Sequence, residues 1–147
     1  MRVLIVEDEP LAAAQLAAHI SALRPEANIL AVCDTVKSTV LWLQNNEAPD
    51  LAFFDIQLGD GLSFEIFEQL SFTQPVIFIT AFDQYAIQAF KVNSVDYLLK
   101  PIDRSELEKA LIKFENLAQP KSSNITPEIL NKIVSTIQKK SVLPVSF

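Results

Sequence analysis

The feature that most constrains the fold is a fivefold alternation of short apolar runs with longer amphipathic segments. The predicted strands are Val3–Val6, Ile29–Cys33, Leu51–Phe54, Val76–Thr80 and Tyr97–Leu99. Most of these runs are continuously apolar, as expected for parallel strands that are covered on both faces. The segments between and after them repeat apolar residues at helical spacing, as Leu107, Leu111 and Phe114 do. Strict alternation of strands and helices predicts an α/β sandwich with right-handed crossovers.

Five strands in this alternation predict a flavodoxin-like, doubly wound fold with a five-stranded parallel sheet in the order 2-1-3-4-5. In that order the first and third strands are neighbours, and binding sites lie at the carboxyl ends of the strands. We expect residues 1–118 to form this domain.

Polar residues end or follow four of the five predicted strands. Glu7 and Asp8 follow the first strand, Asp55 follows the third, Thr80 ends the fourth, and Lys100 follows the fifth. Any one of them alone is usually a solvated turn residue, a helix cap or a strand-end side chain. Because the carboxyl ends of parallel strands meet at one edge of the sheet, the coincidence of all five indicates a functional site there.

Three carboxylates at that edge predict a cation, because like charges at close range raise one another's pKa values. Oxygen ligands suit Mg²⁺, which binds one or two carboxylates and completes its shell with waters and phosphate oxygens. The central carboxylate, Asp55, needs no general base to act as a nucleophile toward a phosphoryl group. The Lys100 ammonium and the Thr80 hydroxyl are placed to hold further phosphoryl oxygens.

Other chemistry-bearing residues have a structural interpretation. Glu9 is expected to be a solvated or capping residue, and Asp60 a turn residue between the two glycines of the chain. His19 lies within a predicted helix and is expected on its surface or flank, and a chain with one histidine offers no zinc cluster. Cys33, the single cysteine, is expected to be a buried thiol.

Composition excludes several function classes. A net charge of −6 gives no electrostatic footprint for binding a nucleic-acid backbone. Two glycines cannot form a three-glycine dinucleotide fingerprint or a P-loop. No signal peptide is visible, and no apolar run approaches the ~20 residues that span a bilayer. We therefore expect a soluble, cytoplasmic protein without membrane association.

Four motifs, VEDE, FFDIQLGDG, FITAF and DYLLKP, follow one another in an order and spacing that resemble the response-regulator receiver domain of two-component signalling. The resemblance covers about residues 1–117. It implies that Asp55 is the phosphoacceptor, that Asp8 binds Mg²⁺ directly and that Glu7 binds it through water. The backbone carbonyl of Gln57 would be a further ligand.

The same resemblance assigns roles on the later strands. Thr80 and Tyr97 would form a switch pair, and Lys100 would precede a cis peptide bond to Pro101. The loop Leu58–Gly61 lacks the proline that the family often has there. The stretch ITAFDQYAIQAFKVNSVDYLLKPID is similar to receivers that precede a LytTR-type DNA-binding domain.

These implications predict a phosphorylation-dependent response regulator rather than an enzyme. A sensor histidine kinase would donate the phosphoryl group to Asp55, and DNA would be bound only through a C-terminal domain that the chain lacks. Two alternatives stay open. An aspartyl-phosphate phosphatase would place a second acid two residues after the nucleophile, where this chain has Gln57. A flavodoxin-like binding module would bind a flavin or nucleotide without needing Asp55.

Residues 119–147 form a separate segment. QPKSSN is a polar linker, after which Thr126 can cap a helix with Pro127 at its first position. That helix would carry an apolar stripe made of Ile129, Leu130, Ile133, Val134 and Ile137. The stripe must be buried on the receiver or on a partner chain, and we favour a dimer. The end, SVLPVSF, resembles the entry to a LytTR domain, so we expect a longer transcriptional regulator.

Overall fold

The computed structural model describes residues 1–82 and 94–118, which form a five-stranded parallel sheet with helices on both faces. The strands are β1 (Arg2–Val6), β2 (Asn28–Cys33), β3 (Leu51–Asp55), β6 (Val76–Thr80) and β7 (Ser94–Leu99). Their order in the sheet is β2-β1-β3-β6-β7. This order confirms the predicted 2-1-3-4-5 arrangement, with β1 and β3 as neighbours.

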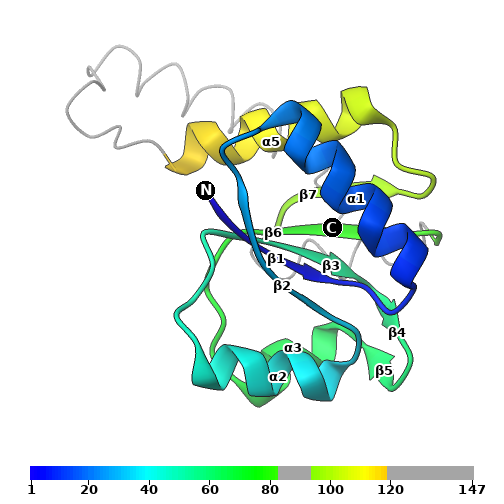
Figure 1. Cartoon of the computed structure of the whole chain (residues 1–147). Coiled ribbons are helices and arrows are strands. Elements are labelled where there is room, and N and C mark those ends of the chain that lie inside the picture. Colours follow the sequence, from blue (N-terminus) through cyan, green and yellow to red (C-terminus); the bar gives the residue numbers. More distant parts are fainter. Residues whose placement is uncertain (83–93, 119–147) are drawn as a thin grey trace, which may run out of the picture. The chain divides into compact units, whose positions relative to one another are not determined.

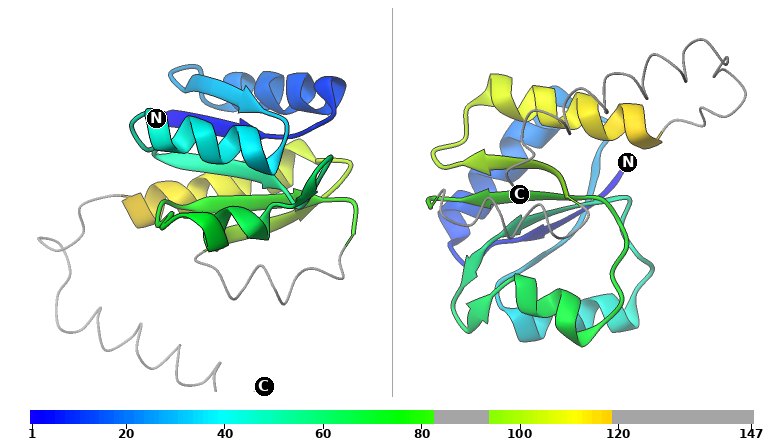
Figure 2. Two further views of the ribbon diagram at one scale, coloured as in Figure 1. Left: turned by 90° about the horizontal axis from the view of Figure 1, so that it is seen from below. Right: turned by 180° about the vertical axis from the view of Figure 1, so that it is seen from behind.

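In the part of the chain that the structure describes, four helices cover the sheet in two layers. They are α1 (Pro10–Leu23), α2 (Val36–Asn45), α3 (Phe64–Gln69) and α5 (Arg104–Ala118). Helices α1 and α5 lie on one face of the sheet, and α2 and α3 lie on the other (Figure 1). The views from below and from behind show the same layering (Figure 2). Among the described residues, no helix has the length and apolar character needed to cross a membrane.

Each face of the sheet has its own hydrophobic core, which explains why the strands read as continuous apolar runs. On one face, Leu16 of α1 and Leu111 of α5 pack with Phe53 of β3. On the other face, Val40 of α2 packs with Phe54 of β3. All five residues of β3 are buried, so the strand that carries the central acid is fixed from both sides.

The strand limits differ from the predicted ones mainly at the edges of the sheet. Strand β7 begins at Ser94, three residues before the predicted start, because Ser94 and Asp96 pair with β6 through their backbones. Polar side chains on an edge strand keep access to solvent, so polarity there does not end the strand.

A small antiparallel hairpin was not predicted. Strands β4 (Gln57–Leu58) and β5 (Gly61–Leu62) pair directly after β3, in the loop that lacks the proline. Asp60 lies in the turn of this hairpin, as expected. Cys33 is buried, also as expected. The linker, the additional helix and the final strand expected for residues 119–147 lie outside the described residues.

Candidate functional site

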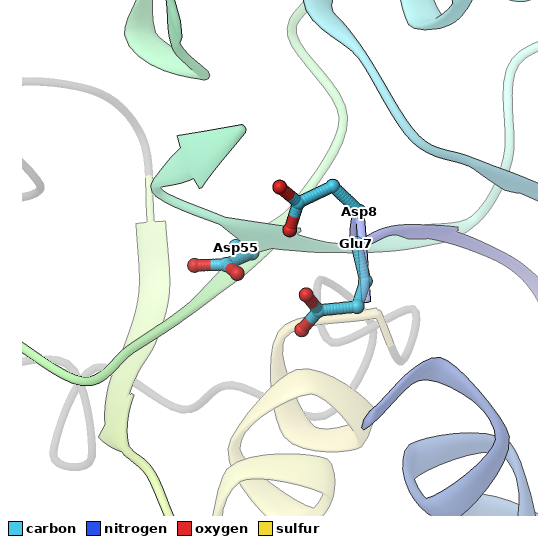
Figure 3. Close-up of side chains that lie close together, drawn as sticks. All are labelled: Glu7, Asp8 and Asp55. Atoms are coloured by element: carbon cyan, nitrogen blue, oxygen red, sulfur yellow. The ribbon is translucent and has the colours of Figure 1, made fainter. Parts of the chain in front are cut away.

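Three carboxylates meet at the carboxyl ends of β1 and β3. Glu7 and Asp8 directly follow β1, and the Glu7 amide donates to the Cys33 carbonyl of β2 at 2.8 Å. Asp55 is the last residue of β3. One carboxylate oxygen from each of Glu7, Asp8 and Asp55 lies within 4.8 Å of the others. Figure 3 shows the three side chains around one space, as the sequence predicts for neighbouring strand ends.

Lys100 reaches this cluster from the end of β7. Its ammonium lies 2.8 Å from Glu7 Oε1 and 3.0 Å from Asp55 Oδ2. Its backbone amide donates to the Thr80 carbonyl at 2.8 Å, which holds the start of the following loop against β6. The peptide bond between Lys100 and Pro101 is cis, as predicted. The lysine therefore bridges carboxylates that belong to two different strands.

The pKa values of the two buried acids are shifted in opposite directions. Burial raises the pKa of Asp55 to about 6, and the Glu7 carboxylate adds to the rise despite the hydrogen bond from Lys100. Burial also acts to raise the pKa of Glu7, but hydrogen bonds with Lys100, Asp55 and the Glu9 amide outweigh it and lower the pKa. Glu7 is therefore the more acidic member of the pair, and Asp55 is the member whose pKa lies closer to neutral pH.

The site carries more negative charge than the lysine can neutralise. Asp8 is exposed, and partial burial together with the Glu7 carboxylate raises its pKa. Burial acts to lower the pKa of Lys100, but Glu7 and Asp55 outweigh it and raise the pKa, so the ammonium stays charged. Three carboxylates against one ammonium leave two negative charges in a space lined by oxygen ligands. This donor set fits a hard divalent cation such as Mg²⁺.

Thr80 and Tyr97 are linked through the backbone of Phe82. The Phe82 amide donates to the fully buried Thr80 Oγ1 at 3.2 Å, and the Tyr97 hydroxyl donates to the Phe82 carbonyl at 2.5 Å. The resemblance named Thr80 and Tyr97 as a pair and placed Phe82 at a position that tunes phosphate lifetime, but it did not predict that the Phe82 backbone joins the two, because a backbone contact leaves no signal in residue type. Tyr97 itself packs against the core on the α2 side of the sheet.

Gln57 and His19 lie next to the site in different ways. Gln57 begins β4, and its backbone amide donates to Asp55 Oδ1 at 3.4 Å. His19 lies on the flank of α1, as expected, and accepts a hydrogen bond from Arg104 at 3.0 Å. It lines a cavity of about 350 Å³ together with Glu7 and Lys100.

Comparison with known proteins agrees with this geometry. The model of the protein family described as "Response regulator receiver domain" matches residues 3–112. The sensory transduction protein LytT of Bacillus anthracis is 34% identical over 97% of this chain and 61% of that protein. The transcriptional regulatory protein BtsR of Escherichia coli is also 34% identical, over 87% of this chain and 54% of that protein. The chain thus spans little more than half the length of these relatives.

A solved structure shows the same fold. The response regulatory domain of protein mrkE from Klebsiella pneumoniae superposes with a TM-score of 0.70 at 32% identity. The match covers 80% of this chain and 97% of that domain.

Proposed function

Because this chain belongs to the response regulator receiver domain family, we propose that Asp55 accepts a phosphoryl group in a two-component signalling pathway. The observation that carries the proposal is the bridge from Lys100 to Asp55 and Glu7 at the ends of neighbouring strands. The Lys100 ammonium lies where it can neutralise charge on a phosphoryl group that is bound to Asp55.

In the proposed transfer, an Asp55 carboxylate oxygen attacks the phosphorus of a phosphohistidine on a sensor histidine kinase. A new O–P bond forms, the N–P bond breaks, and its electron pair leaves with the imidazole of the kinase. Lys100 holds one phosphoryl oxygen, and the Thr80 hydroxyl donates to another. We propose that the donor acts in trans, from a separate kinase, and that His19, whose Nδ1 accepts a hydrogen bond from Arg104, takes no part in the transfer.

The acidic cluster would hold Mg²⁺ in this reaction. Asp8 and Asp55 would bind it directly, Glu7 through water, and the Gln57 carbonyl as a further ligand. A bound Mg²⁺ neutralises charge on the transferring phosphoryl group. The amide in place of an acid at Gln57 supports a switch rather than a phosphatase, since it provides no carboxylic general acid near Asp55.

The test is intact-mass analysis of the protein after incubation with acetyl phosphate and Mg²⁺. We expect one phosphoryl group per chain in the wild type, none in Asp55→Asn, and a sharply reduced amount in Asp8→Asn. His19→Ala should be phosphorylated like the wild type. Equal phosphorylation of Asp55→Asn would refute the assignment, and an absorbance spectrum with a flavin band would favour a flavodoxin-like module instead.

The proposal extends to the whole regulator. LytT and BtsR, of which BtsR is named as a transcriptional regulatory protein, are longer than this chain, so we propose that residues 119–147 connect the receiver to a cytoplasmic DNA-binding domain. The apolar stripe expected in this segment would form a homodimer. Light scattering on this chain and on one ending at Leu117 tests the dimer. If both proteins are monomeric even after phosphorylation, the segment is not a dimerisation element.

A further inference from the structure

We propose that Asp60 is a positioning residue for the metal-binding side of the site, although it lies outside the acidic cluster. Its carboxylate ties the β4–β5 hairpin to the first turn of α2, and the hairpin carries the Gln57 peptide group next to Asp55. The inference rests on the function proposed above, because it concerns the residues that would hold Mg²⁺.

The tie is a helix cap supplied from a distant part of the chain. Asp60 Oδ1 accepts from the Val36 amide at 2.7 Å, and Oδ2 accepts from the Lys37 amide at 3.1 Å. The cap within the helix itself, Thr35, accepts from the Ser38 amide at 2.9 Å and leaves those two donors free. A helix N-terminus favours a negative charge as well as a hydrogen-bond acceptor, and Asp60 provides both.

The rest of the hairpin is held by contacts of its own. Gly61 has a φ of +152°, a backbone conformation that residues with a side chain rarely adopt. The Glu65 carboxylate occupies the space that a Cβ atom on Gly61 would need. Glu65 Oε2 accepts from the Leu62 amide at 3.0 Å. The Ser63 amide donates to the Ile56 carbonyl at 2.8 Å, which closes the base of the hairpin. Asp60 adds two hydrogen bonds that tie the turn to α2.

The hairpin transmits this contact to the site over a short distance. Gln57 pairs with Leu62 across the hairpin and lies two residues after Asp55. Between the anchored turn at Asp60 and the Gln57 peptide lie only two residues, so a loose turn allows that peptide to move. Slight burial acts to raise the pKa of Asp60, but the Val36 and Lys37 amides outweigh it and lower the pKa. The carboxylate therefore stays ionised throughout the neutral range.

Asp34 provides a matched control at the same end of α2. It is an exposed acid two residues before Val36, and its carboxylate accepts from the Ser38 hydroxyl at 3.2 Å. Among the described residues, Asp34 forms no hydrogen bond or ion pair with the hairpin. Asp34→Ala therefore removes the same charge from the same helix end without releasing the hairpin.

The experiment compares the wild type, Asp60→Ala, Asp60→Asn and Asp34→Ala. In metal-free protein, amide hydrogen exchange at Val36, Lys37 and Leu58 should accelerate in Asp60→Ala, because the tie that holds them is lost. Mg²⁺ affinity, measured by isothermal titration calorimetry, should fall about tenfold in Asp60→Ala, the low end for residues that orient metal ligands. Asp60→Asn keeps one acceptor oxygen and should restore part of both properties. Asp34→Ala should match the wild type in both.

Equal hairpin exchange and equal Mg²⁺ affinity in Asp60→Ala and Asp34→Ala would overturn the inference. Faster exchange without any loss of Mg²⁺ affinity would also overturn it, since Asp60 would then be structural only. A wild type that binds no Mg²⁺ and accepts no phosphate would refute the proposed function instead. Circular dichroism at the assay temperature verifies that each variant is folded, so that a fall in affinity reports the site.

Discussion

The ammonium of Lys100 lies 3.0 Å from the carboxylate of Asp55, although the strands that precede Lys100 and end at Asp55 are not neighbours in the sheet. Lys100 follows the edge strand β7, while Asp55 ends the central strand β3. The same ammonium contacts Glu7, so one positive charge serves two buried carboxylates. The charges at this edge of the sheet are therefore interdependent, and removing one changes the others.

Lys100→Met should destabilise the metal-free protein at pH 7.5. The change leaves Glu7 and Asp55 buried without a counter-ion, and we expect a loss of about 2 kcal/mol, below the ~3–5 kcal/mol of a fully buried pair because the lysine keeps some solvent contact. Urea unfolding at pH 7.5 measures the loss. Lys113→Met is the control, since the exposed Lys113 forms an ion pair with the half-buried Asp96 at 3.2 Å. Its cost should stay below about 0.5 kcal/mol, and equal losses in the two variants would contradict the argument.

Asp55→Asn should be more stable than the wild type at neutral pH, by an amount that depends on pH. The folded-state pKa of Asp55 is about 6, above its ordinary value of 3.8, so the folded protein binds the proton more tightly than the unfolded chain. Ionisation of Asp55 therefore opposes folding, fully above about pH 6 and not at all below about pH 4.

The expected gain in Asp55→Asn is about 2 kcal/mol at pH 7.5 in EDTA, and it should disappear as the pH falls to 4. Urea unfolding of both proteins between pH 4 and pH 8 gives this difference directly. Added Mg²⁺ should stabilise the wild type much more than Asp55→Asn. A stability difference that stays constant over the whole pH range would show that the Asp55 charge is not its source.

Two fully buried hydroxyls should respond oppositely to removal. Ser63 Oγ has no hydrogen-bond partner among the described residues, whereas Thr39 Oγ1 donates to the Thr35 carbonyl at 2.7 Å. Ser63→Ala removes an unsatisfied polar atom and should be neutral or stabilising by up to about 1 kcal/mol. Thr39→Val removes a satisfied one and should cost about 1 kcal/mol. Thermal unfolding of both variants compares them, and a clear loss in Ser63→Ala would show that its hydroxyl has a partner such as water.

The sequence was sufficient to predict the order of strands in the sheet. It was also sufficient to predict that Glu7, Asp8, Asp55 and Lys100 lie together. Apolar runs locate parallel strands, and parallel strands place their carboxyl ends at one edge, so the residues that follow them must converge. The same logic fails at β7, where the backbone of Ser94 pairs with β6 although its side chain is polar.

Contacts that depend on geometry at the level of single atoms were not predictable from the sequence. Asp60 was correctly placed in a turn, but nothing in a Gly-Asp-Gly sequence indicates a helix N-terminus 24 residues earlier as its partner. The role of Phe82 was missed for the same reason, because its backbone amide and carbonyl make the contacts and any residue has those groups. Patterns of residue type predict which faces are buried, while such contacts depend on how loops close over the sheet.

The last prediction concerns the contacts that join Thr80 to Tyr97. The Thr80 hydroxyl accepts from the Phe82 amide, and the Phe82 carbonyl accepts from the Tyr97 hydroxyl. A phosphoryl group on Asp55 adds strong acceptor oxygens, and we expect the Thr80 side chain to turn toward them and away from the Phe82 amide. The segment at Phe82 would then shift, and the Tyr97 hydroxyl would lose its present acceptor.

Thr80→Val keeps the shape of the side chain but removes the group that responds to phosphate. It should still accept phosphate on Asp55, because the nucleophile and Lys100 are intact, yet the environment of the Tyr97 ring should no longer change. Fluorotyrosine NMR with and without beryllofluoride reports on that ring, and Tyr85→Phe leaves Tyr97 as the single tyrosine signal. We expect a shifted signal in the Tyr85→Phe background and an unshifted one when Thr80→Val is added. An equal shift in both proteins would show that Tyr97 responds to phosphate by a route that does not pass through Thr80.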